Sequence, residues 1–205
     1  MAPPTRITFV RHGEVHNPRR VLYGRLPRFR LSARGRAQAE AIAAALAHHP
    51  ADALVSSPML RARQTARILL VDRGGLRLST SALLNEVLTP YQGCLEDQVR
   101  CREGDFYTGA PPRYEQPQDV LNRVRRFAHR MVRRHPGGHV LAVTHGDPIA
   151  FFTLWAGGAP VSPSHKTRLA PLGVGGGYPS HASASTYAVP DDPGELPRLL
   201  AHRVP

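Results

Sequence analysis

The sequence predicts an α/β fold, a three-layer sandwich in which a mainly parallel sheet is flanked by helices. Short apolar strand patterns alternate along the chain with longer segments of helical period, and this alternation builds helix-covered parallel sheets. Two strand patterns, Thr5–Arg11 and His139–Thr144, are apolar almost throughout, as expected of strands buried on both faces. For a chain of 205 residues we expect one domain, spanning residues 1–205.

The first strand, Thr5–Arg11, is followed by a loop over Pro18–Phe29 that is rich in Arg, Gly and Pro. A helix is expected to begin at Ser32, a good N-cap residue, because apolar side chains then recur with helical spacing. Pro50 marks the end of this helix.

A second strand–helix unit follows. Ala53–Ser56 is a short strand pattern, and Pro58 suits the first turn of a helix that extends to about Leu70. Gly74-Gly75 ends that helix, and Leu76–Thr80 alternates like a strand.

The segment Leu83–Gln116 has neither a helical nor a strand period. We expect a partly helical excursion above the sheet, with residues at about 87–117 capping the site. Three tyrosines, Tyr91, Tyr107 and Tyr114, either line an aromatic wall there or pack within the cap.

After the excursion the alternation of helix and strand resumes. Gln118–Arg134 is a basic helix with one apolar stripe, and it ends at Gly137-Gly138. The remaining elements are the strand over His139–Thr144, a helix over Asp147–Trp155, a loop over Pro160–Pro179 and a last strand over Thr186–Val189.

The net charge of +12 invites a nucleic-acid interpretation, which the composition makes unlikely as the main function. Lys166 is the only lysine, so nearly all of the basic charge is arginine, as is typical of GC-rich coding. Arginines such as those of Arg123–Arg134 are expected on a solvated helix face. We therefore expect a general attraction for anionic substrates and no nucleic-acid partner.

The chain contains no apolar run near the ~18 residues that a membrane span needs, so no membrane partner is expected. The first residues lead straight into the strand that begins at Thr5, which leaves no room for a secretory signal and predicts a cytoplasmic protein. Cys94 and Cys101 have no Cys or His at a metal-like spacing and are expected to be free thiols.

Two histidines occupy the same local context. His12 and His145 each follow a buried strand pattern and precede a glycine. Because open α/β sheets place ligand sites at the carboxyl ends of their strands, we expect both histidines at one crevice.

Cations suited to phosphate lie beside these histidines. Arg11 adjoins His12, and Arg61 lies early in the helix that follows Ser56-Ser57. A helix N-terminus favours anions, and a guanidinium adds a bidentate fork for phosphate oxygens. The set therefore predicts a phosphate site.

Several spaced motifs then become recognisable as a group. The chain resembles the histidine phosphatase superfamily, the phosphoglycerate mutase-like group with an Arg-His-Gly motif, over about residues 5–155. The motifs that carry the resemblance are Arg11-His12-Gly13-Glu14 with Asn17, Ser56-Ser57-Pro58 with Arg61, Leu84-Asn85-Glu86, and Val143-Thr144-His145-Gly146.

The resemblance implies a role for each residue. His12 is the nucleophile that forms a phosphohistidine, and Glu86 protonates the leaving oxygen and then activates water. Arg11, Arg61 and His145 clamp the phosphoryl oxygens.

Asn17 is implied to bind the phosphoryl group or to orient the substrate. No metal and no cofactor are implied, since arginines and a histidine supply the positive field. One branch of the superfamily has an aspartate directly after its second histidine; here Gly146 intervenes, and Asp147 is interpreted as a helix N-cap.

The substrate is open at this point. We favour a phosphomonoester hydrolase acting on a small phosphorylated metabolite, because the residues after Glu86 depart from the run typical of mutases. A phosphoglycerate mutase-type phosphotransferase and a non-catalytic phospholigand-binding module are the alternatives. Gly24, Arg25 and Tyr91 are candidate substrate contacts, although exposure of Arg25 or packing of Tyr91 is an equal or better interpretation.

Oligomeric state is not encoded in any visible pattern, and both a monomer and a homodimer are compatible with the sequence. The stretch Gly173–Ser185 is rich in glycine and small residues and is expected to be a mobile loop. Its composition neither requires nor excludes that this loop closes over the site.

Overall fold

The structure is a computed structural model that describes residues 3–71 and 73–205. Within these residues, strands form one mixed sheet in the order β3-β2-β4-β1-β5-β6. The pairs β3–β2, β2–β4 and β4–β1 are parallel, whereas β5 pairs antiparallel with both β1 and β6. The strands are β1 (Thr5–Arg11), β2 (Ala53–Ser56), β3 (Leu78–Thr80), β4 (His139–Thr144), β5 (Ala184–Val189) and β6 (Arg198–Arg203).

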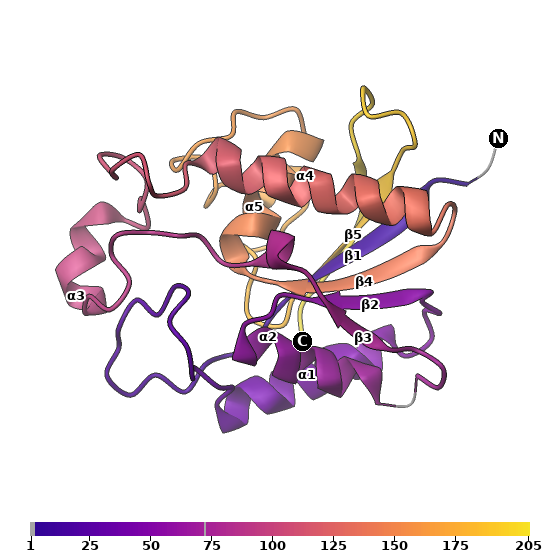
Figure 1. The fold of residues 1–205 in the computed structure, drawn as a ribbon, viewed down its shortest axis with the longest axis horizontal. Coiled ribbons are helices and arrows are strands. Elements are labelled where there is room, and N and C mark those ends of the chain that lie inside the picture. Colours follow the sequence, from indigo (N-terminus) through magenta and orange to yellow (C-terminus); the bar gives the residue numbers. More distant parts are fainter. Residues whose placement is uncertain (1–2, 72) are drawn as a thin grey trace.

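Helices cover both faces of the sheet, as Figure 1 shows, so the predicted α/β three-layer sandwich is confirmed. One layer holds α1 (Ala33–Leu46) and α2 (Leu60–Leu70), and the other holds α4 (Pro117–Arg134) and α5 (Gly146–Ala156). The short helix α3 (Glu96–Val99) lies away from the sheet, in the excursion between β3 and α4.

Each face of the sheet has its own apolar core, because side chains alternate between the faces of a strand. Phe9 on β1 packs with Phe127 of α4 and Phe152 of α5. On the opposite face, Val10 packs in a cluster with Ile42 of α1 and with residues of α2.

The pairing of β1 with β4 positions the site. Arg11 lies opposite Thr144 in a parallel register, so the residues that follow them, His12 and His145, leave the sheet side by side. The backbone N–H of His12 donates to the carbonyl of Thr144 at 3.0 Å, which carries the pairing one residue beyond the strand.

The helix starts depend on local capping. Ser32 caps α1 as predicted, since its side chain accepts a hydrogen bond from the N–H of Gly35. The prediction that Pro58 lies in the first turn of α2 is wrong. Residue Met59 has extended backbone, and the Met59 N–H turns back to the Ser57 hydroxyl, so the helix begins only at Leu60.

The last strand is also not the one predicted. The pattern over Thr186–Val189 belongs to a longer β5 that starts at Ala184, and β6 follows it as an antiparallel partner. β6 lies at the sheet edge with one face partly exposed, so it lacks the continuous apolar pattern that marks a buried strand.

The excursion holds short helical turns and buried aromatic side chains. Tyr107 is 1% exposed and packs edge-on against Phe151 of α5. Cys94 and Cys101 are free thiols. Over the part of the chain that the structure describes, no helix is both long enough and apolar enough to cross a bilayer.

Candidate active site

The two predicted histidines lie together at the carboxyl ends of β1 and β4. The centroids of the rings of His12 and His145 are 5.1 Å apart, and both side chains are almost fully buried. Gly13 and Gly146, the glycines after them, are required for close packing: a Cβ at Gly13 would collide with the backbone of Gly35, and one at Gly146 with the hydroxyl of Tyr178.

Hydrogen bonds define the tautomer of His12. Its Nδ1 lies 2.8 Å from the carbonyl oxygen of Gly13, which can only accept, so Nδ1 carries the proton. Its Nε2 accepts from Arg61 Nε at 3.1 Å and therefore holds the lone pair. Burial, together with the nearby charges of Arg61 and Arg11, holds the pKa of His12 well below its usual value, so the ring is neutral.

Arg61 links the two histidines from the second position of α2, where it is 1% exposed. Besides His12, its guanidinium donates to His145 Nδ1 at 3.1 Å and to the carbonyl oxygen of Gly24 at 2.8 Å. The guanidinium also lies 4.7 Å from the centroid of the Tyr23 ring. A phosphoryl group that reaches Nε2 of His12 must therefore displace the hydrogen bond from Arg61 Nε, which can then donate to a phosphoryl oxygen.

His145 is oriented by Ser57, which the sequence marked as part of a motif without indicating a role. Because its Nδ1 accepts from Arg61, its Nε2 carries the proton and donates to the Ser57 hydroxyl at 2.9 Å. Ser57 in turn donates to Asn85 Oδ1 at 3.2 Å. Burial and the charge of Arg61 hold the pKa of His145 well below its usual value.

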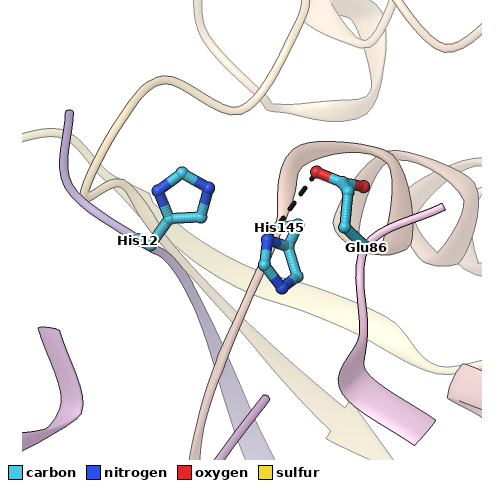
Figure 2. A group of neighbouring side chains, drawn as sticks. All are labelled: His12, Glu86 and His145. Atoms are coloured by element: carbon cyan, nitrogen blue, oxygen red, sulfur yellow. Dashed lines mark ion pairs between the residues drawn. The ribbon is translucent and has the colours of Figure 1, made fainter. Parts of the chain in front are cut away.

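Glu86 approaches the histidines from the segment after β3, and Figure 2 shows its carboxylate beside His145. Its Oε2 lies 3.7 Å from His145 Nδ1, and its Oε1 accepts from the N–H of Val87 at 2.9 Å. Burial and the nearby carboxylate of Asp147 raise the pKa of Glu86, which favours the protonated acid.

Arg25 supports Glu86 from outside. Its Nε donates to the backbone carbonyl of Glu86 at 2.6 Å, and its Nη2 pairs with Glu115 at 2.8 Å. Glu115 is also paired with Arg123, so Arg25 and Arg123 share one carboxylate. Arg25 therefore contacts the acid segment itself, and its contact with a substrate stays a prediction.

Arg11 lies beside His12 and is held by the loop between α5 and β5. It donates to the carbonyl oxygen of Pro179 at 2.6 Å and to His181 Nε2 at 3.3 Å. Among the described residues, its buried Nε has no hydrogen-bond partner. This leaves one buried donor free beside the nucleophile.

Asn17 and Tyr91, two further predicted contacts, make their side-chain hydrogen bonds and ring contacts among the described residues with groups other than His12, Arg61 and His145. The side chain of Asn17 closes its own loop, accepting from the N–H of Val21 at 3.2 Å and donating to its carbonyl at 2.9 Å. Tyr91 packs against Phe106, with its ring centroid 4.5 Å from the guanidinium carbon of Arg102.

Asp147 does not cap α5, so its prediction as an N-cap is wrong. His145 occupies the N-cap position, so Asp147 is the second residue of the helix, where its side chain is buried. Its carboxylate accepts from Lys166 at 2.7 and 3.0 Å, from Tyr107 at 2.5 Å and from Tyr178 at 2.6 Å. We call these four residues the Asp147 cluster.

A cavity of about 280 Å³ connects the two groups of residues. Arg11 and Glu86 line it on the side of the histidines, and Lys166 and Tyr178 line it on the side of the Asp147 cluster. Tyr23 and Phe106 supply aromatic walls. Two cationic side chains, Arg11 and Lys166, therefore face one cavity that has aromatic side walls.

The segment Gly173–Ser185 contributes to this site. Tyr178, Pro179 and His181 all contact site residues, although the sequence marked the segment only as a loop. Lys166 had one visible signal, being the only lysine of an arginine-rich chain.

The ligand atoms of His12, Glu86 and His145 lie within 4.8 Å of one another, a spacing that a metal ion can use. The lone pairs of both histidines, however, already accept from Arg61. A cation there would have to displace a buried guanidinium and lie beside Arg11, so the charge of the site suits an anion.

Comparisons with known proteins agree with this geometry. The family profile described as histidine phosphatase superfamily (branch 1) matches residues 7–175. An uncharacterised protein of Mycobacterium tuberculosis, Rv0525, is 46% identical over 93 residues; this match spans 45% of the chain and 46% of the relative, so the chain matches about half the length of that protein.

Solved structures match along nearly the whole chain. The mycobacterial glucosyl-3-phosphoglycerate phosphatase Rv2419c superposes with a TM-score of 0.77 at 27% identity, covering 97% of both chains. YhfR of Bacillus stearothermophilus superposes with a TM-score of 0.80 at 25% identity, covering 96% of both chains.

Proposed function

The chain belongs to the histidine phosphatase superfamily, branch 1, and from this premise we propose that it hydrolyses phosphomonoesters of small metabolites through a phosphohistidine. The observation that carries the proposal is the neutral tautomer of His12. Its proton is held on Nδ1 by Gly13, and its lone pair on Nε2 lies among cations that attract a phosphoryl group.

In the first step, His12 Nε2 attacks phosphorus as the bond to the leaving oxygen breaks. Arg61 and Arg11 stabilise the charge on the phosphoryl oxygens, with the free Nε of Arg11 as one donor. His145, whose ring proton is donated to Ser57, contributes by holding Arg61 through its Nδ1. The raised pKa of Glu86 favours its acid form, and from that form Glu86 gives its proton to the leaving oxygen, so the alcohol departs neutral.

In the second step, water replaces the alcohol beside the phosphohistidine. The carboxylate of Glu86 takes a proton from this water as its oxygen attacks phosphorus, and the bond from phosphorus to Nε2 breaks. Inorganic phosphate leaves, and His12 and Glu86 return to their starting protonation states. The residues provide the positive field and the proton carrier for both steps.

The substrate class follows from the cavity and from the relatives. The cavity of about 280 Å³, with its aromatic walls, suits a compact organic group rather than a protein surface. Rv2419c, which shares the fold over nearly its whole length, is a glucosyl-3-phosphoglycerate phosphatase. A small phosphorylated metabolite is therefore the proposed substrate.

The test is hydrolysis of p-nitrophenyl phosphate in EDTA by the wild type and by His12→Ala, followed by a screen of phosphorylated metabolites. We expect turnover and an acid-labile phosphoenzyme in the wild type, and neither in the variant. Equal turnover by both proteins contradicts the assignment of His12 as nucleophile.

The same samples separate the alternatives. Phosphorus NMR that shows phosphoglycerates interconverting faster than they are hydrolysed identifies a mutase. Binding of phosphate esters without turnover or a trapped phosphoenzyme identifies a ligand-binding module. Release of inorganic phosphate from a metabolite ester supports the hydrolase.

A further inference from the structure

A third histidine lies beside the nucleophile. His181, from the segment between α5 and β5, has its ring centroid 5.8 Å from that of His12. Its Nε2 lies 3.3 Å from Arg11 Nη2, and because a guanidinium only donates, the imidazole is the acceptor.

Arg11 is therefore fixed at two of its three nitrogens. Nη1 donates to the carbonyl oxygen of Pro179 at 2.6 Å, and Nη2 donates to His181. Nε is buried and, within the described chain, unpartnered. A planar guanidinium held at both ends keeps its third donor in one direction, which lowers the ordering cost of binding a phosphoryl oxygen.

We propose that His181 is a positioning residue for phosphoryl transfer, a neutral acceptor that holds Arg11 so that its Nε remains available to the phosphoryl oxygen. The proposal rests on the proposed function and names a residue of the site outside the motifs that mark it in the sequence.

A neutral acceptor suits this position better than a carboxylate. A carboxylate would neutralise Arg11 and reduce its attraction for phosphate, whereas an imidazole orients the guanidinium and leaves its charge intact. Burial, with the charges of Arg11 and Arg34, lowers the pKa of His181 to about 3, so the ring stays an acceptor at neutral pH.

Three variants test this role. His181→Leu removes the acceptor, His181→Asn keeps a neutral oxygen acceptor, and His181→Glu adds a negative charge beside Arg11. His129→Leu, at a half-buried histidine on α4, is the matched control. Inorganic phosphate binding by calorimetry and kcat/KM across pH are measured for each protein.

We expect His181→Leu to weaken phosphate binding and lower kcat/KM by about 10- to 100-fold, the range of a hydrogen bond to a charged group. His181→Asn should recover most of both, and His181→Glu should move the acidic limb of kcat/KM to higher pH, because a nearby anion raises the pKa of His12.

Wild-type phosphate affinity in His181→Leu, or no recovery in His181→Asn, overturns the proposal. Because phosphate binding needs no turnover, these outcomes stay readable even if no ester is hydrolysed, a result that would count against the proposed function instead.

Discussion

The two sides of the cavity are built in different ways. The phosphoryl pocket, formed by Arg11, His12, Arg61 and His145, comes from strand ends and the start of a helix. The Asp147 cluster draws its side chains from α5, from the excursion and from two parts of the loop between α5 and β5.

The difference separates chemistry from selectivity. Under the proposed function, the phosphoryl pocket would contact the part that all phosphomonoesters share, so its residues should affect every substrate equally. The Asp147 cluster and the aromatic walls would then face the organic part, so changes there should depend on the ester. The predictions below test this division, from the largest expected effect to the smallest.

Arg61→Leu removes the donors to both histidines. We expect kcat/KM to fall about 10⁴-fold for every ester, since removal of one such donor commonly costs about 10²–10³-fold and Arg61 supplies more than one. Arg67→Leu, an exposed arginine on the same helix, is the control and should leave kcat/KM unchanged. A loss restricted to some esters would break the division.

Glu86→Gln removes the acid while keeping the shape of the side chain. We expect kcat/KM to fall by roughly 10²–10⁴-fold, and least for p-nitrophenyl phosphate, whose leaving group needs little protonation. In the wild type, kcat/KM should decrease as pH falls through the depressed pKa of His12 and as it rises through the raised pKa of Glu86.

The variant should keep the acidic limb of this profile and lose the basic one, because an amide does not titrate. If the basic limb of the profile survives in Glu86→Gln, a group other than Glu86 causes it, and the assignment of Glu86 as the acid is contradicted.

Lys166→Met leaves the Asp147 carboxylate buried without its cation. We expect the free energy of unfolding to fall by about 3–5 kcal/mol, measured by urea denaturation at neutral pH. The double variant with Asp147→Asn should be less destabilised than Lys166→Met, because no unpaired charge is left. An undiminished loss in the double variant would contradict the ion-pair explanation.

The ion pair between Asp147 and Lys166 also makes the free energy of unfolding depend on pH, in a defined direction. Burial raises the pKa of Asp147, but Lys166 and the tyrosine hydroxyls outweigh it and lower the value overall. The stabilisation is therefore present above the pKa of the unfolded chain and is lost as pH falls through the lowered one. In Lys166→Met the cation no longer outweighs burial, so the pKa of Asp147 should rise, and the destabilisation relative to the wild type should shrink as pH falls and the carboxyl is protonated.

Ser57→Ala removes the acceptor of His145 Nε2. We expect kcat/KM to fall roughly tenfold or less, equally for all esters, because a neutral hydrogen bond contributes about 0.5–1.5 kcal/mol. Ser164→Ala, at an exposed serine, is the control. A loss that varied with the leaving group would contradict the placing of Ser57 with the phosphoryl pocket.

Phe106→Ala enlarges the cavity on the side of the organic group. We expect KM to rise a few-fold for esters with a large apolar group and to stay unchanged for compact ones such as glycerol phosphate, as measured by steady-state kinetics. Uniform changes across both classes would contradict the assignment of this wall to selectivity.

Much of the phosphoryl pocket could be predicted from the sequence because its residues are anchored to local signals. A strand pattern that runs into His12 or His145 specifies where the side chain leaves the sheet, and the start of a helix specifies Arg61. Parallel pairing then brings the ends together, a general property of such sheets.

The sequence by itself predicted the layered α/β fold, which the structure confirms, and singled out His12, Arg11 and Arg61, which the structure brings together. Only the tertiary structure decided that Arg25 holds the Glu86 segment, that Asn17 closes its own loop, and that Asp147 is paired with Lys166. The physical reason is range: strand and helix patterns repeat over a few residues, whereas these partners lie on loops whose paths depend on the packing of the whole chain.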